Sequence, residues 1–584
     1  MRLGRETHED LVRGFAVVRE VAWRKLGERP YPVQVAAGMA ILDGNVTEVA
    51  TGEGKTLCAT MPATIAGWRG LGCHIITVND YLARRDAEWM GEIYKFFGLR
   101  CAFVVNQLPP PDRRQAYRAA ITYGTNKEIA ADVLRDRIAM GRMLGLPKVL
   151  LGKLVDGVVG GADRLVMRGL NFAIVDEADS VLVDEAVTPL IISGSAPNEQ
   201  QMEAFVQAAE LARQLAPGPD YKVDLRFREV RLTRGGRNNL ADLCEKLGGI
   251  WAGTRRREEL VNQALTAREM YQLDKQYVIQ DGKIVIVDEF TGRLMADRSW
   301  RDGMHQAVEA KEEVEVTPPK DTLARISFQR FFRMYHKLSG MTGTAAEAQH
   351  ELWQVYHLPV VRIPTHRPCI RIHHPDRIFA DADTKWEAIV RHIEEVHKTG
   401  RPILVGSRNV GASERLSAML TQIGVEHQVL NAVRHAEEAG IVAQAGQEGR
   451  VTVATNMAGR GTDIKLGRGV ADNGGLHVIA TERHEDGRID RQLFGRAARQ
   501  GDPGSAVAYS ALNDELIQRH ASRWAKRIIR RFAGSREQLS GPSPYRIINQ
   551  TQARAAHMAF KQRKAVLKTD DWLDEYLGFA GSET

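Results

Sequence analysis

The stretch Thr51-Gly-Glu-Gly-Lys-Thr56 decides the fold prediction for this chain. It follows a short apolar run, Val46–Ala50, and it opens a second run, Leu57–Trp68, that can continue as a helix. A strand, a glycine turn and a helix N-terminus in this order present backbone N–H groups and the positive end of a helix dipole to phosphate oxygens. The stretch therefore predicts a phosphate-binding loop in an α/β domain.

The residue types in this loop suit a phosphate. Gly52 and Gly54 allow the backbone to approach closely, Lys55 can reach the terminal phosphates, and the Thr56 hydroxyl can complete the shell of a Mg²⁺ ion. The loop departs from the strict pattern G-x-x-x-x-G-K-[ST], because Val49 stands where the first glycine is expected. Taken alone, the loop could therefore be an ordinary turn.

A second signature, Asp176-Glu-Ala-Asp179, follows the apolar strand Asn171–Val175. In open α/β sheets, the carboxyl ends of the strands face the ligand crevice. We expect Asp176 to hold Mg²⁺ through water and Glu177 to orient and deprotonate the attacking water. The alternative, an acidic loop after a buried strand, is disfavoured by the lysine loop upstream.

A third signature, Gly495–Gln500, supplies positive charge. Arg496 and Arg499 are three residues apart, which predicts that they share one face of a helix, and phosphoryl transfer needs positive charge at the γ-phosphate. The alternatives are a solvated basic face or a nucleic-acid contact. We prefer arginine fingers, because Thr455–Ile464 lies just upstream with glycines and an aspartate suited to a ribose and a moving hinge.

Composition sets the broad class. With 584 residues, 43% hydrophobic and 26% charged, we expect a globular chain of roughly three or four domains. No N-terminal signal peptide is visible. The cysteines form no C-x-x-C pair, so we expect neither a zinc site nor a disulfide framework, and a reducing cytoplasm fits. They are Cys58, Cys73, Cys101, Cys244 and Cys369.

Two segments of the sequence are candidates for contact with a membrane or with an acidic partner. Gly141–Gly161 is the candidate for membrane contact, but its charged residues and proline exclude a bilayer span, and an ordinary surface insertion is preferred to an exposed hairpin or an amphipathic surface helix. Leu516–Thr584 holds 13 Lys or Arg against 6 Asp or Glu, so it carries the whole net charge of +7. Such a tail favours anionic lipid, nucleic acid or an acidic partner, or else a solvated helix face packed along the rest of the chain.

Strand and helix patterns alternate over residues 30–190 and again after residue 400, which predicts two doubly wound parallel-sheet lobes. Residues 190–330 predict instead an inserted α+β module, with Tyr277–Val287 as a hairpin on an Asp-Gly turn. Asp288–Met295, at the end of this hairpin, could serve as a hinge. The region after Leu516 has no strand pattern and predicts helices, with a basic helix over Gln550–Leu567. The other expected elements are strands at Cys73–Val78, Pro402–Val405, Val451–Ala454 and Leu476–Ile479, and a helix at Tyr81–Phe97.

Several motifs together closely resemble the SecA family of bacterial preprotein translocation ATPases. The resemblance runs from roughly residue 10 to residue 571 and implies two RecA-like lobes. The motifs are Gln34, Thr77–Asp86, Thr122–Asn126, Phe172–Ser180 with Thr188–Gly194, Gly340–Ala345 and Gln500–Gly504.

The resemblance implies a domain plan and a site. Nucleotide-binding lobe 1 would comprise residues 1–189 and 331–365, a preprotein cross-linking-like domain residues 190–330, lobe 2 residues 366–515, and a truncated helical scaffold-like tail residues 516–584. Lys55, Asp176, Glu177, Arg496 and Arg499 would be catalytic, and Thr56 and Asp176 would serve the Mg²⁺ ion. ATP would be bound by Gln34, which would read the adenine edge, and by Gly52, Glu53, Gly54, Lys55, Thr56 and Asp463.

The implied partners are an unfolded preprotein, a SecYEG-type channel and anionic lipids, at the cytoplasmic face of the bacterial plasma membrane. A homodimer stays open, and nucleic acid is not expected. Two other functions are weighed against this one. A DEAD-type RNA helicase matches Asp176–Asp179 and the basic tail, but such helicases lack the long insertion. An ATP-switched binding protein without transport activity is the other alternative.

The chain departs from the family pattern at several places. Phe494 stands where arginine is more usual, and Ala497 and Ala498 replace Ser-Gly, which should stiffen the loop and slow or alter nucleotide coupling. The stretch 137–168 is longer than usual. Family members also continue with a long scaffold helix, a wing domain and a two-helix finger, so we expect a short member that lacks most of that region. Whether it is a natural short paralogue or a truncated form stays open.

Overall fold

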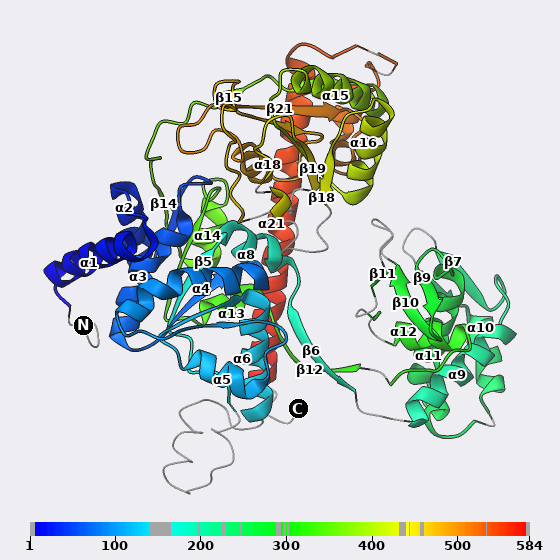
Figure 1. The fold of residues 1–584 in the computed structure, drawn as a ribbon. Helices are drawn as coiled ribbons and strands as arrows, with labels where there is room; N and C mark the ends of the chain where they lie inside the picture. The colour runs from blue at the N-terminus through cyan, green and yellow to red at the C-terminus, as the bar shows by residue number, and fades with distance from the viewer. Residues whose placement is uncertain are drawn as a thin grey trace, which may run out of the picture. The chain divides into compact units, whose positions relative to one another are not determined.

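The computed structural model divides the chain into two compact units, one made of Met1–Ile191 and Ala324–Thr584 and the other of Ile192–Leu323. Figure 1 shows the path of the chain through both units. The residues described are 6–140, 165–195, 199–224, 229–245, 247–287, 294–295, 299–300, 303–318, 320–430, 440–442, 444–455, 461–532, 534–535 and 537–579.

Lobe 1 of the larger unit is built on a parallel sheet with the strand order β14-β1-β13-β5-β2-β4-β3. The strands are β1 (Val46–Glu48), β2 (Cys73–Thr77), β3 (Cys101–Val104), β4 (Ile121–Thr125), β5 (Phe172–Asp176), β13 (Lys337–Thr342) and β14 (Val360–Arg362). The central strands β2, β4 and β5 are buried along their length, as expected for a parallel sheet covered by crossover helices. This confirms the predicted doubly wound lobe.

The helices of lobe 1 include the predicted element after the phosphate loop. They are α1 (His8–Leu26), α2 (Pro32–Leu42), α3 (Lys55–Arg69), α4 (Asp80–Phe96), α5 (Pro110–Tyr117), α6 (Asn126–Met140), α8 (Ala178–Leu182), η2 (Asp184–Val187), α13 (Phe328–Arg333) and α14 (Gln349–Tyr356). Side chains of α1 to α4 pack with β2 and β5 into the main core of the lobe. The core holds α3 in place, so the loop at its N-terminus is set against the carboxyl edge of the sheet.

Lobe 2 repeats the architecture. Its parallel sheet has the order β15-β21-β20-β17-β19-β18, with β16 also paired to β21. The strands are β15 (Ile372–His373), β16 (Arg377–Phe379), β17 (Ile403–Ser407), β18 (Gln428–Leu430), β19 (Val451–Thr455), β20 (Leu476–Ala480) and β21 (Gly504–Ala511). The helices are α15 (Ala382–His397), α16 (Val410–Gln422), α18 (Gly487–Phe494), α19 (Glu515–His520) and α20 (Arg523–Ile529).

The smaller unit has its own core, in which Trp251 belongs to one cluster with side chains of α9, α11 and α12. The hairpin predicted on an Asp-Gly turn is confirmed, since β9 and β10 pair antiparallel and Asp281 and Gly282 both have positive φ. The elements are α9 (Glu199–Gln214), β7 (Tyr221–Asp224), β8 (Glu229–Leu232), α10 (Arg234–Leu243), η3 (Gly249–Ala252), α11 (Thr254–Met270), β9 (Tyr277–Gln280), β10 (Lys283–Val287), β11 (Leu294–Met295) and α12 (Met304–Lys311). The chain enters and leaves through the paired strands β6 (Leu190–Ser195) and β12 (Lys320–Ile326).

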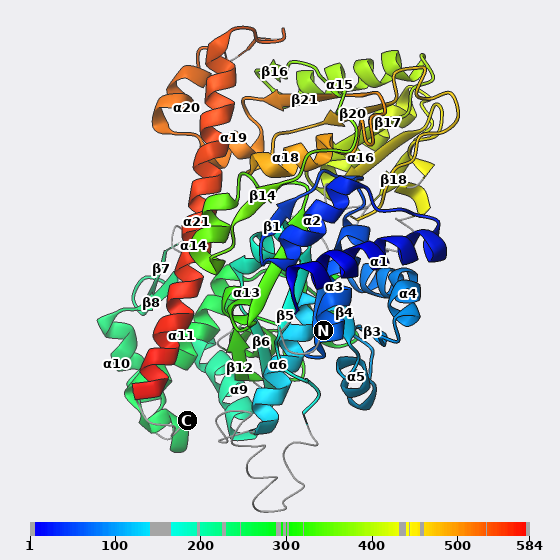
Figure 2. The same cartoon turned by 90° about the vertical axis from the view of Figure 1, so that its left-hand side faces the viewer.

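The C-terminal region is helical, as predicted, and ends in the long helix α21 (Pro542–Phe579). Figure 2 shows α21 in red, running past α19 and α14. On lobe 2, Gln552 Nε2 donates to Asp490 Oδ2 at 2.7 Å. On lobe 1, the Arg563 guanidinium donates to both carboxylate oxygens of Glu351 at 2.7 Å, and both side chains are buried. This helix therefore joins the two lobes within the larger unit.

Some sequence-based expectations fall on residues outside the described ranges. These are the membrane-contact candidate Gly141–Gly161 with most of the 137–168 stretch, the hinge candidate Asp288–Arg293, and part of Thr455–Ile464. Within the described ranges, none of the helices combines the length and the apolar character that a bilayer crossing requires.

Candidate functional site: the interface between the two lobes

The phosphate loop connects β1 to α3. Gly52 and Gly54 have φ of +85° and +74°, a left-handed conformation that glycine adopts without steric cost. Gly54 is the N-cap of α3, and Lys55 is the first residue of the helix. The N–H groups of a helix's first turn lack intrahelical partners, and the helix dipole is positive there. The loop therefore has the backbone geometry of an anion site.

The acidic motif lies opposite this loop. Lys55 Nζ is 3.2 Å from Glu177 Oε1, and the two side chains are 10% and 3% exposed. Burial alone would lower the pKa of Lys55, but the carboxylates of Glu177 and Asp176 raise that pKa above its ordinary value. Burial, followed by the charge of Glu177, raises the pKa of the Asp176 carboxyl well above its usual range. Burial and the neighbouring carboxylate both disfavour the charged form of Asp176, and a bound cation would favour it.

Asp179 joins the acidic motif to the segment Gly340–Ala345. Its two carboxylate oxygens accept hydrogen bonds from Thr342 Oγ1 at 2.6 Å and Thr344 Oγ1 at 2.7 Å. The contact arises because β13 lies parallel and adjacent to β5, with Met341 opposite Asp176. Both motifs are visible in the sequence, but their proximity is not, because 163 residues separate Thr342 from Asp179.

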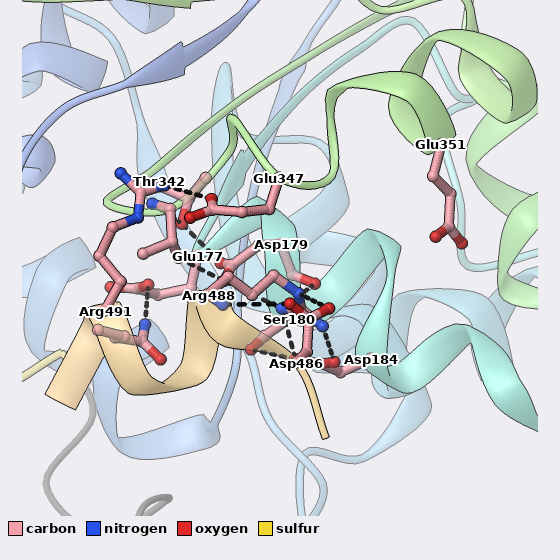
Figure 3. A network of polar contacts seen from close by, with 12 residues as sticks. Glu177, Asp179, Ser180, Asp184, Thr342, Glu347, Glu351, Asp486, Arg488 and Arg491 are labelled. Atoms are coloured by element: carbon pink, nitrogen blue, oxygen red, sulfur yellow. Dashed lines mark hydrogen bonds and ion pairs between the residues drawn. The ribbon is translucent and has the colours of Figure 1, made fainter. Parts of the chain in front are cut away.

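Helix α18 of lobe 2 reaches into lobe 1 through Arg488, which is 1% exposed. Its guanidinium is ion-paired with Asp179 at 3.2 Å, with Asp184, and with Asp486 of its own lobe at 2.9 Å. Figure 3 shows this network around the acidic motif. Burial alone would lower the pKa of Arg488, but these carboxylates raise it above its ordinary value, so the guanidinium stays charged.

The next turns of α18 add further contacts to lobe 1. Arg491 donates to both carboxylate oxygens of Glu48, at 2.9 and 3.1 Å, and also pairs with Glu347 (Figure 3). Gln492 Nε2 donates to Glu177 Oε2 at 3.2 Å. Arg488, Arg491 and Gln492 were missing from the sequence-based site. Their only local signal was a charged helix just before the predicted arginine fingers.

The predicted helical face for Arg496 and Arg499 is wrong. Helix α18 ends at Phe494 with Gly495 as its C-cap, and the following loop includes two left-handed residues, Ala498 with φ +54° and Gln500 with φ +52°. The two arginines are therefore presented by a folded loop rather than a helix. Alanine in the left-handed region costs roughly 1–2 kcal/mol relative to its normal conformations, so the loop carries backbone strain at the position where the family more usually has glycine.

Arg499 reaches the phosphate loop. Its side chain lies so close to Gly52 that a Cβ on that glycine would stand 2.6 Å from the arginine Cδ. Its guanidinium is ion-paired with Asp463 and donates to the Gly495 carbonyl at 3.1 Å. The structure therefore brings Arg499, Asp463 and the phosphate loop together.

Arg496 contacts residues of its own lobe. It donates to the Thr462 carbonyl at 3.5 Å and lines a small cavity with Leu404, Thr455 and Ile464. Phe494 is buried between the His373 ring, at 5.7 Å, and the Arg483 guanidinium, also at 5.7 Å. The aromatic residue thus replaces the family's more usual arginine with a packing contact.

Gln34 lies beside the phosphate loop. Its Nε2 donates to the Glu53 carbonyl at 2.9 Å, and its Oε1 accepts from the Tyr31 N–H at 2.7 Å. Gln34 is buried against Gly54, where a Cβ would stand 2.5 Å from its Nε2. Thr56 lies in the first turn of α3, beside Lys55. The sequence-predicted residues of the phosphate loop, the acidic motif and Arg499 therefore gather where lobes 1 and 2 meet.

Comparisons with known proteins identify the two lobes. Residues 1–353 match the SecA DEAD-like domain, and residues 368–471 and 467–537 match the SecA P-loop domain. The chain is 46% identical over 574 residues to Protein translocase subunit SecA 2 of Nitrosospira multiformis, covering 98% of this chain and 86% of the relative. It is 44% identical over 587 residues to Protein translocase subunit SecA 2 of Chlorobium chlorochromatii, covering 100% and 88%.

A third relative is a longer protein. The chain is 45% identical over 594 residues to Protein translocase subunit SecA of Caldicellulosiruptor saccharolyticus, covering 98% of this chain and 67% of the relative. The domain matches and these identities span nearly the whole chain. The chain belongs to the SecA family of protein translocase ATPases.

Proposed function

We propose that lobes 1 and 2 form a cleft at their interface that binds MgATP, and that hydrolysis of this ATP drives the movement of unfolded preproteins. The observation that carries this proposal is the convergence of Lys55, Glu177 and Arg499 on one glycine loop from three distant parts of the chain. A buried lysine, a buried carboxylate and an arginine from the second lobe are the groups that phosphoryl transfer to water requires.

The charges of the site are paired in a way that a triphosphate can exchange. Lys55 is held by Glu177, and Arg499 is held by Asp463. Phosphate oxygens at the loop would take both cations as partners and free Glu177 to hold the attacking water and accept its proton. Gln492, which donates to Glu177, would position that carboxylate from lobe 2. Hydrolysis would therefore require the two lobes to be together.

Asp176 and Thr56 suit a Mg²⁺ ion. Both carry oxygen donors of the kind that this cation prefers, and Asp176 lies beside a second carboxylate, that of Glu177. When bound, the ion would neutralise charge on the phosphate oxygens. Asp176 would hold it, largely through water, and Thr56 would complete its shell.

The site has a physical connection to the inserted unit. Strand β6 begins at Leu190, a few residues after Asp184, which pairs with Arg488 of lobe 2. Strand β12 ends at Ile326, and the next N–H, that of Ser327, donates to Asp570 of α21 at 2.6 Å. Both ends of the inserted unit are therefore attached to elements that join lobe 1 to the rest of the large unit. We infer that opening and closing of the cleft moves this unit against a bound polypeptide.

The finer assignments belong to the same proposal. Lobe 1 would comprise residues 1–189 and 331–365, and lobe 2 would comprise residues 366–515. Residues 190–330 would be the preprotein-binding domain, and residues 516–584 would be a scaffold-like helical tail. The partners would be an unfolded preprotein, a SecYEG-type channel and anionic lipids at the inner face of the plasma membrane. Measurement of the molecular mass in solution would show whether the chain forms a homodimer.

The test is ATP hydrolysis by the full chain in buffer, with an unfolded preprotein, with single-stranded RNA and with anionic vesicles. We expect stimulation by the preprotein, and further stimulation when vesicles are added. Stimulation by RNA alone, with no response to polypeptide, would overturn the proposal in favour of a helicase. Nucleotide-dependent binding of the preprotein without stimulation would favour a binding switch instead.

A further inference from the structure

Lobe 2 holds a basic cluster on the face of its sheet that is covered by α15. The core cluster on one face of this sheet includes side chains of α18, and the cluster on the other face joins Ile479 and Tyr509 to side chains of α15. His477 lies two residues before Ile479 on β20, and Ser505 lies four residues before Tyr509 on β21, so both face α15. Figure 2 shows α15 beside β21. The members of the basic cluster are His374, Arg377, His392, Arg401 and His477.

The two arginines of the basic cluster have no carboxylate partner. Arg401 donates to two backbone carbonyls and to Ser505 Oγ, at 2.8 to 3.0 Å. Arg377 Nη1 donates to the Tyr509 hydroxyl at 2.9 Å. Both side chains are half-buried, and within the described ranges neither forms an ion pair with Asp or Glu. Burial lowers the pKa of Arg401 below its ordinary value, and no carboxylate opposes this shift.

The histidines add unused hydrogen-bonding capacity. His477 is 1% exposed, and its Nδ1 is 2.7 Å from Ser505 Oγ. Its Nε2 is buried and has no hydrogen-bond partner in the part of the chain that the structure describes. The ring centroids of His392 and His374 lie 4.9 and 6.2 Å from that of His477. Burial first, and then the neighbouring basic groups, lower the pKa of His392 to about 4 and that of His477 to about 3, so both rings are neutral near pH 7.

We propose that this basic cluster is a binding site for a small tetrahedral oxyanion, either inorganic phosphate or the phosphate monoester of a small molecule. Guanidinium groups pair with the oxygens of phosphate in planar, bidentate geometry, and imidazoles supply further N–H donors. An anion would also offset the cost of holding two guanidiniums away from water without an opposite charge. The exposed ring of His374 marks the side from which the ligand enters.

A metal ion is the other ligand that three histidines could suggest. The two guanidiniums beside the rings repel a cation, and within the described residues no three His, Cys, Asp or Glu side chains are arranged to hold one. The nucleotide is not the ligand either, because α18, which leads into the loop that carries Arg499, packs on the opposite face of the sheet. The oxyanion site is therefore additional to the proposed ATP site and does not depend on it.

Binding of the anion should be accompanied by uptake of protons. A bound anion favours the charged imidazolium, so it would raise the pKa of His392 from its low value in the free chain, and the affinity would rise as the pH falls. Tyr509, which faces His392, has a pKa of about 12 and stays neutral in this range. The other charged groups that act on Tyr509 are Arg391 and Glu395 of α15, whose effects oppose each other. The remaining charges that act on His392 are those of the basic cluster itself.

The test is calorimetric titration of the full chain with sulfate, inorganic phosphate and glycerol 3-phosphate at low ionic strength. Mg²⁺ and a non-hydrolysable ATP analogue are present in excess, so that the phosphate loop is not free to take the anion. The variants are Arg377→Gln and His374→Gln. Arg450→Gln is the matched control, since Arg450 is an exposed arginine of the same lobe just before β19. The urea midpoint of each variant without anion shows that it folds.

We expect Arg377→Gln to raise the Kd for all three anions about tenfold, because a charge-assisted hydrogen bond is lost, and His374→Gln to raise it about threefold. Arg450→Gln should bind like the wild type. Sulfate, which keeps both charges over this range, should bind the wild type about tenfold more tightly at pH 6 than at pH 8. Tighter binding of glycerol 3-phosphate than of phosphate would identify a monoester as the ligand, and the reverse order would identify inorganic phosphate.

Three results would overturn the inference. The first is that none of the three anions binds to the wild-type chain. The second is that Arg377→Gln and His374→Gln bind the anions as Arg450→Gln does, which would indicate only diffuse attraction to a positively charged chain. The third is that Zn²⁺ binds and is lost in His374→Gln while the oxyanions do not bind. Failure of the ATP analogue to bind would overturn the proposed function alone, because the comparison between these variants does not require the nucleotide.

Discussion

Replacing Arg488 by methionine tests how strongly α18 holds the two lobes together. Arg488 is 1% exposed and is paired with Asp179 and Asp184 of lobe 1, so the substitution leaves two carboxylates facing an apolar side chain. Removing one partner of a buried ion pair costs about 3–5 kcal/mol. Asp179 keeps its two threonine donors and Asp184 is 31% exposed, so we expect a cost at the lower end, about 3 kcal/mol.

This cost is removed when the lobes separate, because the carboxylates of lobe 1 then return to water. A penalty of about 3 kcal/mol therefore lowers the ratio of closed to open molecules about a hundredfold. The assay is energy transfer between dyes on the exposed faces of α1 and α16, read beside the rate of ATP hydrolysis. Both the closed population and the rate should fall.

Arg491→Met is the matched control on the same helix. Arg491 pairs with Glu48 and Glu347, but its side chain is 36% exposed, so the loss should be about 1 kcal/mol after screening by solvent. The expected order of damage is thus Arg488 well above Arg491. If the two variants lost the same closed population, or if Arg491→Met lost more, the reasoning from burial would be refuted.

Three further predictions concern buried titratable groups. Glu177→Gln should keep ATP binding while hydrolysis falls by about a hundredfold or more, since the amide cannot accept a proton; retention of the wild-type rate in a single-turnover assay would contradict its role as base. Arg563→Met should destabilise the chain to urea by about 3–5 kcal/mol, whereas the double variant with Glu351→Leu should recover most of that loss, and an equally damaged double variant would argue against a coupled pair. Burial lowers the pKa of His477 to about 3, below its unfolded value near 6.5, so the folded chain binds fewer protons between these pH values. The free energy of unfolding therefore falls as the pH falls through this window, by about 2 kcal/mol between pH 7 and pH 5. His477→Gln should flatten the pH dependence of the urea midpoint. An unchanged slope in this variant would exclude His477 as the cause.

Local signals in the sequence predicted much of the fold. The strand Cys73–Thr77, the helix Asp80–Phe96 and the hairpin on Asp281-Gly282 all form as expected, because periodicity and turn chemistry act over a few residues. The position of β13 between β1 and β5 could not be derived in that way. It depends on a strand that returns after the whole inserted unit, and no local pattern specifies such a pairing.

The candidate site divides along the same line. Lys55 and Glu177 could be predicted because each follows a strand in a recognisable loop, and parallel strands end at one edge of the sheet. The role of α18 could not be predicted from local sequence, because Arg488 and Arg491 form ion pairs with carboxylates of the other lobe. The prediction that Arg496 and Arg499 share a helical face was wrong for a further reason. Gly495 is the C-cap of α18, and a glycine at this position ends a helix even where the spacing of the following residues suits one.

The most direct test of the account is a structure of the full chain with Mg²⁺ and a non-hydrolysable ATP analogue. We expect Lys55 to leave Glu177 and Arg499 to leave Asp463, so that both cations contact oxygens of one triphosphate while Gln492 still reaches Glu177. A structure in which the nucleotide binds with Arg499 still paired to Asp463 and away from the phosphates would contradict the claim that one cleft, closed by both lobes, performs the hydrolysis.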